Sequence, residues 1–479
     1  MSLSRQPAMG RIVTPLLSLP LAFSLAACAT LPEKAVLSPI AAPESLASGE
    51  SLAAAQAEWP SDGWWTRFDD PQLTALIEEG LKGATDLRVA EARFTRAQAL
   101  AGQAKAPLLP SLTAAAEGGT QQQSNHYLMP EGFAPRGWPA YGQATLGLSW
   151  DLDFWGRNRA ALAAARSEAE AAQAEAAAAR LAVATGIADA YAQLASLHAE
   201  RDAAQDAARV RQRSFELMEG RQAKGLENRG ASERARSGLA TAQGEIAALD
   251  EAIALTQNRI AALLGAGPDR GRAITRPQPA QIAAWGLPAN LPADLIGRRP
   301  DIIAARLRAE AAGSRIRQAK AAFYPNINLA GLIGVQALGL DNVFKSGSDF
   351  GSAGPAISLP IFDGGRLRGQ YRAAEADYQA AVAQYDGVLT QALREVADAA
   401  ASERQLTERL AHARQAESAA AAAWKVAGNR YRGGLATYLD VLTAEDALIA
   451  ARRAVASLQT RAFALDIALI RALGGGFRS

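Results

Sequence analysis

The sequence predicts a mainly α-helical chain of two tandem structural repeats, each with long helices and two strands of a small sheet. Three observations predict this class. Motifs recur along the chain at nearly constant spacing, long alanine-rich stretches lack proline, and short stretches between them alternate apolar with polar residues. Alanine is the best helix former, and an alternation of period two is typical of strands.

Two copies of one unit account for most of the chain. The segment Gln103–Pro110 returns after 215 positions as Gln318–Pro325, and Gly156-Arg157 returns after 209 positions as Gly365-Arg366. The spacing shortens by six residues, so a loop between Pro110 and Gly156 must differ in length. We expect repeat 1 at 71–265, an inter-repeat linker at 266–293, repeat 2 at 294–474 and a C-terminal tail at 475–479.

The N-terminus is typical of an export signal. Arg5 and Arg11 form a short positive region before an uncharged apolar stretch, Ile12–Ala27, which is too short to span a membrane and ends in Leu-Ala-Ala before Cys28. This pattern indicates a signal peptide over residues 1–27. Because it resembles the bacterial lipobox, we expect Cys28 to carry N-acyl and S-diacylglycerol groups and to begin a lipidated segment, 28–70. An ordinary signal with an incidental cysteine is the alternative.

Each repeat is expected to contain one shorter helical segment and two long ones. The shorter segments are Leu73–Lys105 and Asp294–Lys320, each followed by a proline. The first long helices run from about Arg157 to Glu219 and from about Leu367 to Asn429. The last helix of repeat 2 has an apolar residue every seven positions: Val441, Leu448, Val455, Ala462 and Leu469. A second seam comprises Ala444, Ala451, Leu458, Leu465 and Ala472. Sustained heptads predict coiled-coil packing, with an ordinary helical bundle as the alternative.

Four segments with alternating polarity predict strands at about 110–120, 141–154, 325–337 and 350–362. In the second of these segments, the even positions Leu146, Leu148 and Trp150 are apolar. The odd positions Thr145 and Ser149 are polar. Lengths near ten residues suit a tilted bilayer span. The alternative is a half-buried sheet in a soluble domain.

Four membrane strands cannot close a barrel, and open edges in lipid would leave backbone N–H and C=O groups unsatisfied. Three chains would supply the strands of a trimeric 12-stranded transmembrane β-barrel, within the known range. The same closure would arrange the long helices as an α-barrel below it.

Several motifs resemble those of one family. Repeat 2 and its flanks contain Gly286–Ile302 with L-P-x-D-L and R-R-P-D-I, then Ala322–Pro325, Leu359–Arg366 and Ala472–Gly476. In these motifs the chain is similar to the TolC superfamily, in particular to NodT-type outer-membrane lipoproteins of resistance–nodulation–division (RND) efflux systems. The resemblance covers essentially the whole predicted mature chain.

The resemblance implies a homotrimer in the cell outer membrane that passively conducts drugs or other small molecules. Its implied partners are outer-membrane lipid, a periplasmic adaptor protein and an inner-membrane proton-driven RND transporter. It places 119–140 and 339–350 in extracellular loops and the turns near Gly225 and Gly434 at the periplasmic tip. A duct of a type I protein secretion system shares this architecture and is the alternative. A lipid-anchored coiled-coil spacer without a pore is a third possibility.

The segment Tyr431–Leu442 resembles the family's tip motif, Y-x-x-G-x-x-x-x-x-D-V-L. Carried over by position, Asp440 would form a three-fold carboxylate ring in the channel gate, Tyr431 would hold neighbouring helices together, and Gly434 belongs to the turn. Carboxylate rings in narrow pores favour cations. The sequence departs from the family pattern, in which an Arg or an Asp is found, at Ala436, Thr443 and Ala231. A weaker or different lock is expected, and a simple helix cap at Asp440 is the alternative.

Composition excludes most other functions. Fifty cationic and 48 anionic side chains nearly cancel, so no nucleic-acid partner is expected. One cysteine and three histidines leave little material for a metal site. No G-x-S-x-G or H-E-x-x-H motif occurs. We therefore expect no enzyme, no catalytic residue, no bound metal and no cofactor beyond the lipid on Cys28.

Overall fold

The computed structural model describes residues 36–42, 45–47, 50–52, 57–124, 135–278, 286–288 and 291–478. The expected signal peptide and Cys28 lie outside the described residues, as do parts of the linker and of the 119–140 loop. The chain divides into two compact units. The sheet unit includes Ala97–Glu168 and Arg308–Val382, and the helical unit consists of Pro39–Arg96, Ala169–Leu307 and Ala383–Ser479.

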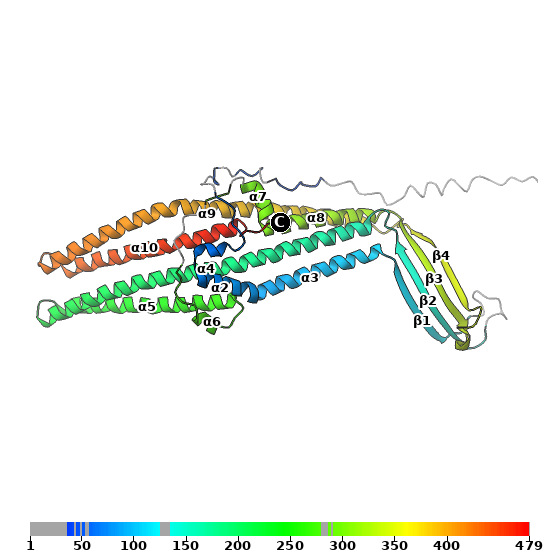
Figure 1. The fold of residues 1–479 in the computed structure, drawn as a ribbon, viewed down its shortest axis with the longest axis horizontal. Coiled ribbons are helices and arrows are strands. Elements are labelled where there is room, and N and C mark those ends of the chain that lie inside the picture. The colour runs from blue at the N-terminus through cyan, green and yellow to red at the C-terminus, as the bar shows by residue number, and fades with distance from the viewer. Residues whose placement is uncertain are drawn as a thin grey trace, which may run out of the picture. The chain divides into compact units, whose positions relative to one another are not determined.

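The sheet unit contains a four-stranded antiparallel sheet (Figure 1). Its strands are β1 (Ser111–Thr120), β2 (Ala140–Asp151), β3 (Asn326–Leu338) and β4 (Asp349–Ser358), paired in that order. The central pair joins the two predicted repeats, because Gly147 of β2 lies opposite Leu332 of β3. Within the described part of the chain, β1 and β4 each pair on one side only.

Two strands end before the positions that alternation predicts. β2 stops at Asp151 because Asp153 adopts a left-handed backbone (φ 45°) and its carboxylate accepts bonds from Asn158 N and Arg159 N, both at 2.9 Å. These bonds cap helix α4 (Arg157–Ala223). β4 stops at Ser358, just before Pro360, which has no N–H for a ladder bond.

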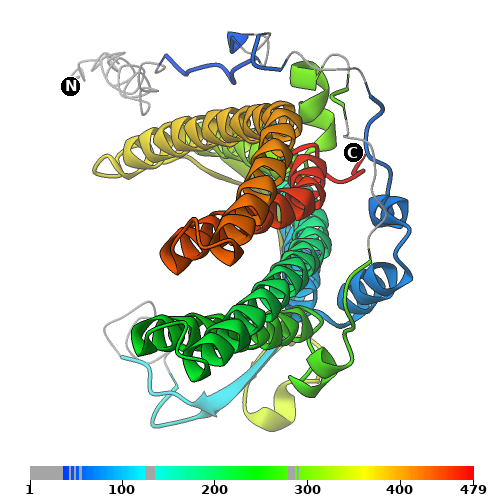
Figure 2. The same ribbon diagram turned by 90° about the vertical axis from the view of Figure 1, so that its left-hand side faces the viewer.

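The helices fall into two long pairs and several short elements (Figures 1 and 2). α4 pairs with α5 (Arg229–Leu263), and α9 (Arg366–Arg432) pairs with α10 (Tyr438–Ala472). α4 and α9 each have 67 residues, about 100 Å of helix at 1.5 Å per residue. The remaining elements are η3 (Trp64–Phe68), α2 (Pro71–Gly83), α3 (Thr85–Lys105), η4 (Ala106–Leu108), α6 (Asp269–Arg272), α7 (Leu291–Arg298), α8 (Pro300–Ala321) and η5 (Leu340–Asn342).

The shorter helical segment of each repeat is broken, where a single helix was expected. In repeat 1, α2 ends at Gly83 and Ala84 is extended (ψ 130°) before α3 begins. In repeat 2, α7 ends at Arg298 and α8 begins at Pro300. A residue that precedes proline is disfavoured in the helical region, and proline is well suited to the first helical position.

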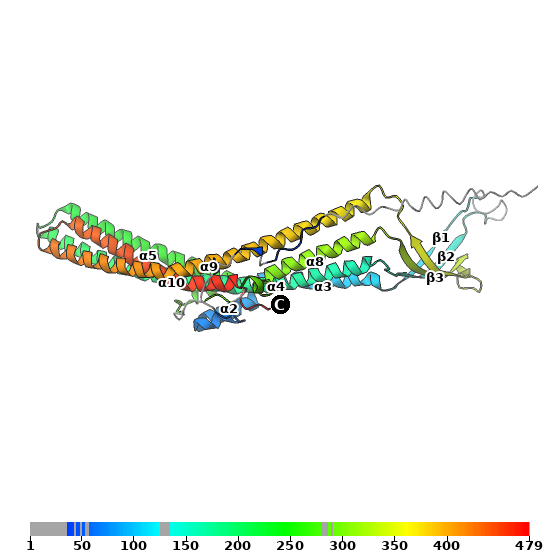
Figure 3. The same ribbon diagram turned by 90° about the horizontal axis from the view of Figure 1, so that it is seen from above.

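The helical unit contains two large apolar clusters, and α10 contributes side chains to both. Ile187 and Tyr191 of α4 pack with Ile260 of α5 and with Leu73 and Ile77 of α2. The second cluster contains side chains from α7, α8, α9 and α10: Leu295, Ile302, Tyr385, Leu389, Val396 and Leu469. Figure 3 shows α5 beside α4 and α10 beside α9 along this part of the chain.

The heptad on α10 is only partly correct. Val441, Leu448, Val455 and Leu469 are buried, but Ala462 is exposed and Phe463 is buried in its place. At the start of the second seam Ala444 is half-buried, and the charged Glu445 beside it is fully buried. Packing of α10 on several neighbours at once widens its buried face beyond a strict heptad stripe.

A polar network attaches the N-terminal segment and the linker to α4. Asp70 caps α2 by accepting from Gln72 N (2.9 Å), and its other oxygen accepts from the Tyr191 hydroxyl (2.7 Å). Gln72 Oε1 accepts from Thr275 N at 2.9 Å. Burial raises the pKa of Tyr191 far above its ordinary value, so the phenol stays a donor at any physiological pH.

Among the described residues, no helix combines the length and the hydropathy needed to cross a membrane.

Candidate functional site

The two turns that end the long helices have the same backbone geometry. Gly225 after α4 and Gly434 after α9 are left-handed, with φ of 68° and 72°. In each turn the next residue bonds back five positions: Leu226 N to Arg221 O at 2.9 Å and Leu435 N to Arg430 O at 2.8 Å. These are Schellman caps, which require a residue without strain at positive φ. We call the two segments, 224–228 and 433–437, the tip turns.

Asp440 closes the turn in repeat 2 by capping α10. Thr437 is the N-cap, and Asp440 Oδ2 accepts from both Thr437 N and Thr437 Oγ1 at 2.8 Å. These bonds complete a capping box and lower the pKa of Asp440. The helix cap weighed as the alternative for Asp440 is therefore present, and the side chain is also exposed. The capping role and the expected gate role can coexist, because the cap only fixes where the carboxylate lies.

The corresponding turn in repeat 1 has a cap without a carboxylate. Asn228 accepts from Ala231 N at 3.0 Å, and Ala231 occupies the place of Asp440. The backbone of the two tip turns is thus shared, whereas the charge at the start of the following helix is not.

Tyr431 connects the second helix pair to the first tip turn. Its ring is buried, and its hydroxyl donates to Glu227 Oε1 at 2.8 Å while lying 3.4 Å from Met218 Sδ. The Arg221 guanidinium lies 4.9 Å from the ring centre. Burial, and then Glu227, raise the pKa of Tyr431 to about 12. The hydroxyl is therefore a proton donor at neutral pH.

Sequence reasoning identified Tyr431 but missed its partner. Glu227 lies in the other tip turn, 204 positions away, and no local pattern connects the two. A detectable signal was present at Thr437, because Thr-x-x-Asp before an apolar stretch is a capping-box pattern. The structure therefore brings Tyr431 to the first tip turn and bonds Asp440, in the first turn of α10, to Thr437 of the second tip turn.

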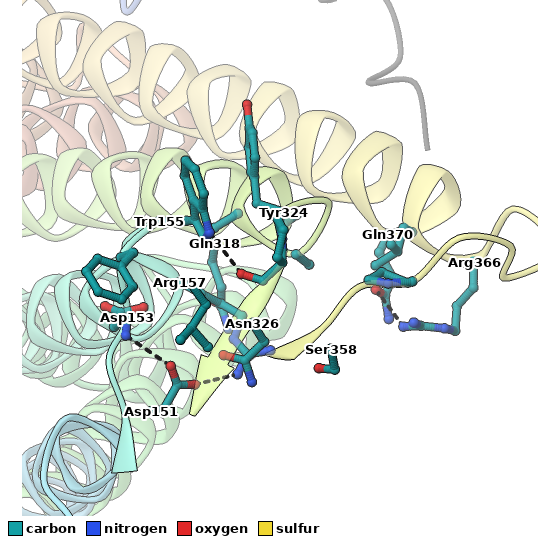
Figure 4. Close-up of a pocket in the computed structure, with 18 of the residues that line it drawn as sticks. Asp151, Asp153, Trp155, Arg157, Gln318, Tyr324, Asn326, Ser358, Arg366 and Gln370 are labelled. Carbon is teal, nitrogen blue, oxygen red and sulfur yellow. Dashed lines mark hydrogen bonds and ion pairs between the residues drawn. The ribbon is translucent and has the colours of Figure 1, made fainter. Parts of the chain in front are cut away.

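A polar pocket of about 510 Å³ lies where the strands of the sheet unit meet its helices (Figure 4). Trp155 and Tyr324 stack at 4.7 Å between ring centres, and Trp155 Nε1 donates to Pro325 O at 2.8 Å. Arg157 pairs with Asp151 at 3.0 Å. Exposed aromatic side chains with polar tips are typical of the border between a membrane and water.

No group of three or more metal-ligating side chains is close enough to hold a metal ion within the ranges that the structure describes. His198, on α4, is partly buried, and burial, followed by Arg276, lowers its pKa. His412 lies 4.0 Å from Glu408 on the same helix.

Comparison with known proteins adds the family. The family model for outer membrane efflux proteins matches residues 76–266 and 291–475. The toluene efflux pump outer membrane protein TtgF of Pseudomonas putida is 32% identical over 472 residues, covering 96% of both chains. The fusaric acid resistance protein FusA of Burkholderia cepacia is 36% identical over 360 residues, which are 74% of this chain and 67% of that protein.

A solved structure agrees with these relatives. The outer membrane protein VceC of Vibrio cholerae has 48% sequence identity and a TM-score of 0.83, covering 88% of this chain and 100% of the other. The family model spans most of the chain in two blocks, and the fold is that of an outer-membrane efflux channel. The chain is an efflux protein of the outer membrane and belongs to the outer membrane efflux protein family.

Proposed function

We propose that the chain is the passive exit duct of a tripartite efflux pump and works as a homotrimer. The observation that carries this proposal is the four-stranded sheet, whose outer strands β1 and β4 each have one edge without a pairing strand in the described protomer. Its apolar side chains are exposed, among them Leu112, Ile333 and Ile357 at 64–68%. Such a sheet is stable in a bilayer only if other chains complete it.

Three protomers would pair β4 of one chain with β1 of the next and close a 12-stranded barrel. The central β2–β3 contact is a precedent within the chain, because it already joins the last strand of one repeat to the first strand of the other. The protein would then conduct small molecules without catalysis, so energy must come from its partners.

The partners we propose are a periplasmic adaptor and an inner-membrane proton-driven transporter. Leu226 and Leu435, which follow the left-handed glycines of the tip turns, are 60% and 72% exposed. Exposed leucines at equivalent positions of two similar turns suit contact with another protein. Apolar or amphiphilic small molecules are the proposed cargo, since the relatives are a toluene efflux protein and a fusaric acid resistance protein.

We propose a gate at the tip turns in which Asp440 supplies a ring of three carboxylates and Tyr431 restrains the helices. The cap holds Asp440 at the first turn of α10, and its bonds from Thr437 favour the carboxylate by lowering its pKa. Gly434 gives the turn its left-handed residue. Without an Arg at 436 or an Asp at 443, the gate depends on fewer charged groups than the family pattern has.

Conductance of the purified mature protein in planar bilayers tests the duct. We expect discrete, cation-selective channels, and Asp440→Asn should reduce the cation preference while the fold is preserved. Asparagine keeps an oxygen that can accept from Thr437 N, so this variant separates charge from capping. Unchanged selectivity would leave Asp440 as a cap only. No current from the wild type or from Asp440→Ala would refute the channel.

Tyr431→Phe should loosen the closed tip. The variant loses the bond to Glu227, worth about 1 kcal/mol, but keeps the ring in its apolar surroundings. We expect the open fraction of single channels to rise about fivefold. Tyr141→Phe, on β2 of the sheet unit, removes a comparable bond to Glu117 (2.7 Å) and serves as the control. Equal open fractions for Tyr431→Phe and the wild type would contradict a restraining role.

We also propose that Cys28 carries the lipid anchor. Cys28→Ser should abolish metabolic labelling with palmitate, because a hydroxyl cannot form the thioether. Membrane insertion should persist, since the proposed barrel is independent of the anchor. Mass spectrometry of the N-terminal peptide is the check, and labelling that survives the substitution would exclude Cys28 as the modified residue.

A further inference from the structure

A buried carboxylate lies beyond the tip turns on α10, in a place that the proposed gate does not use. The Glu445 side chain is 0% exposed. It comes one helical turn after Val441 and shortly before Leu448, two buried residues of the same helix face. Glutamate is almost never fully buried unless it is paired, so its partners indicate what the position does.

The partners belong to the other helix pair. Ser214 Oγ on α4 donates to Glu445 Oε2 at 2.9 Å, and Arg211 Nε on α4 lies 3.1 Å from Glu445 Oε1. The Arg211 side chain is itself only 13% exposed, and its Nη2 contacts Asp446, which is 66% exposed. One guanidinium thus joins α4 to two consecutive carboxylates of α10, one buried and one in water.

The surroundings shift the titration of this group. Burial raises the pKa of Glu445, whereas Arg211, Ser214 and Trp424 of α9 lower it and Asp446 raises it. Tyr438 of α10 faces the same cluster, and burial, followed by Glu445, raises its pKa to about 12. The side chains that shift the pKa of Glu445 therefore come from three helices, α4, α9 and α10 itself.

We propose that Glu445 and Arg211 form a latch between the α4–α5 pair and the α9–α10 pair, which opening of the periplasmic end must break. The inference rests on the proposed channel function. If α10 moves away from α4, the buried carboxylate and the guanidinium both lose their partner and enter water. The latch is separate from the gate residues, because Asp440 bonds within its own turn and Tyr431 bonds to Glu227.

The repeat shows that this latch is confined to one helix contact. At the 209-residue spacing, Glu445 and Asp446 correspond to Arg236 and Ser237 of α5. Arg211 and Ser214 correspond to Ala420 and Ala423 of α9. The second copy of this surface therefore lacks both the buried acid and its cation. In a trimer, the latch would restrain the contact within a protomer and not its counterpart between protomers.

The direction of the pH effect follows from linkage. The latched state holds Glu445 with a raised pKa, and the released state exposes it with an ordinary one. The state with the higher pKa binds the proton more tightly, so acid favours the latched state and alkali favours release. Without Arg211, an ionised Glu445 would be buried with no adjacent cation, and this dependence should become steeper.

Single-channel recording of the trimer tests the latch. Arg211→Gln should raise the open fraction at least about tenfold at about pH 8, and by a smaller factor at about pH 5, because acid favours the protonated form of the buried Glu445. Adding Glu445→Gln to that variant should restore the wild-type value at both pH values. The control is Arg453→Gln on α10. Its ion pair with Glu245 is more than a third exposed, so about a twofold change at most is expected.

If the Arg211→Gln variant fails to assemble, a second measurement tests the latch without it. The open fraction of wild-type channels should rise with pH, and Glu445→Gln alone should remove that rise. Wild-type behaviour of Arg211→Gln at about pH 8, a double variant as leaky as the single one, or a pH response unaltered by Glu445→Gln would each overturn the latch. Absence of current in every variant, the wild type included, would instead refute the channel function.

Discussion

Replacing Gly474 with alanine is expected to destabilise the helical unit by about 3 kcal/mol, the sum of left-handed strain and overpacking. Gly474 follows α10 with φ 89°, and a Cβ there would lie 2.1 Å from the carbonyl oxygen of Arg298. Backbone cannot yield as the end of a side chain can, so the ends of α10 and α7 would have to separate. Circular dichroism melts of detergent-solubilised protein should show a lower melting temperature.

Two other glycines make this prediction specific. Gly265, at the corresponding place in repeat 1, would bring a Cβ to 2.4 Å from Gly83 O, so Gly265→Ala should have a similar effect. Gly267, two residues further on, has nothing within 4 Å of a Cβ, and Gly267→Ala should melt like the wild type. A melting temperature that is unchanged in Gly474→Ala would show that the ends of α10 and α7 are not packed this closely.

The second large effect is expected at Arg299, between α7 and α8. Its guanidinium is buried and contacts Asp301 Oδ2 at 2.6 Å, Glu395 Oε2 of α9 at 2.8 Å and the carbonyl of Ala472 at 3.0 Å. Arg299→Met fills the space but removes every one of these bonds. We expect a loss of about 3 kcal/mol, because one buried guanidinium supplies charge-assisted bonds to two partly exposed carboxylates and a bond to a carbonyl, and all are lost together.

The same melting experiment measures this loss. Arg272→Met is the control: that side chain is 86% exposed and lies 3.9 Å from its partner Asp269, so its pair contributes little. If Arg299→Met and Arg272→Met melted alike, the contacts of Arg299 would be unimportant for stability.

Much of the architecture could be predicted from the sequence, because it depends on local patterns of residues. The mainly helical class with antiparallel strands is confirmed. α4 and α9 begin within one residue of the expected positions, since Gly-Arg recurs where each helix starts. Their ends lie three or four residues beyond the expected ones, because each helix continues up to the Schellman turn that its glycine makes possible.

What the sequence could not disclose depends on contacts between distant segments. A heptad pattern indicates only apolar positions, so it did not indicate that Glu445 is buried. That burial is possible because Arg211 and Ser214 contact Glu445 from another helix. Tyr431 was identified by its motif, but its bond to Glu227 needs the two turns to be adjacent. Whether Cys28 is lipidated stays a prediction.

The shared backbone of the tip turns and their unequal caps have a consequence for recognition. A partner protein that contacts only the main chain or the exposed leucines would bind the two tip turns equally well. One that reads charge would distinguish them, because only the hairpin ending at Thr437 presents a carboxylate at the start of the next helix. The two repeats therefore share the backbone geometry of this turn and differ in the charge beside it.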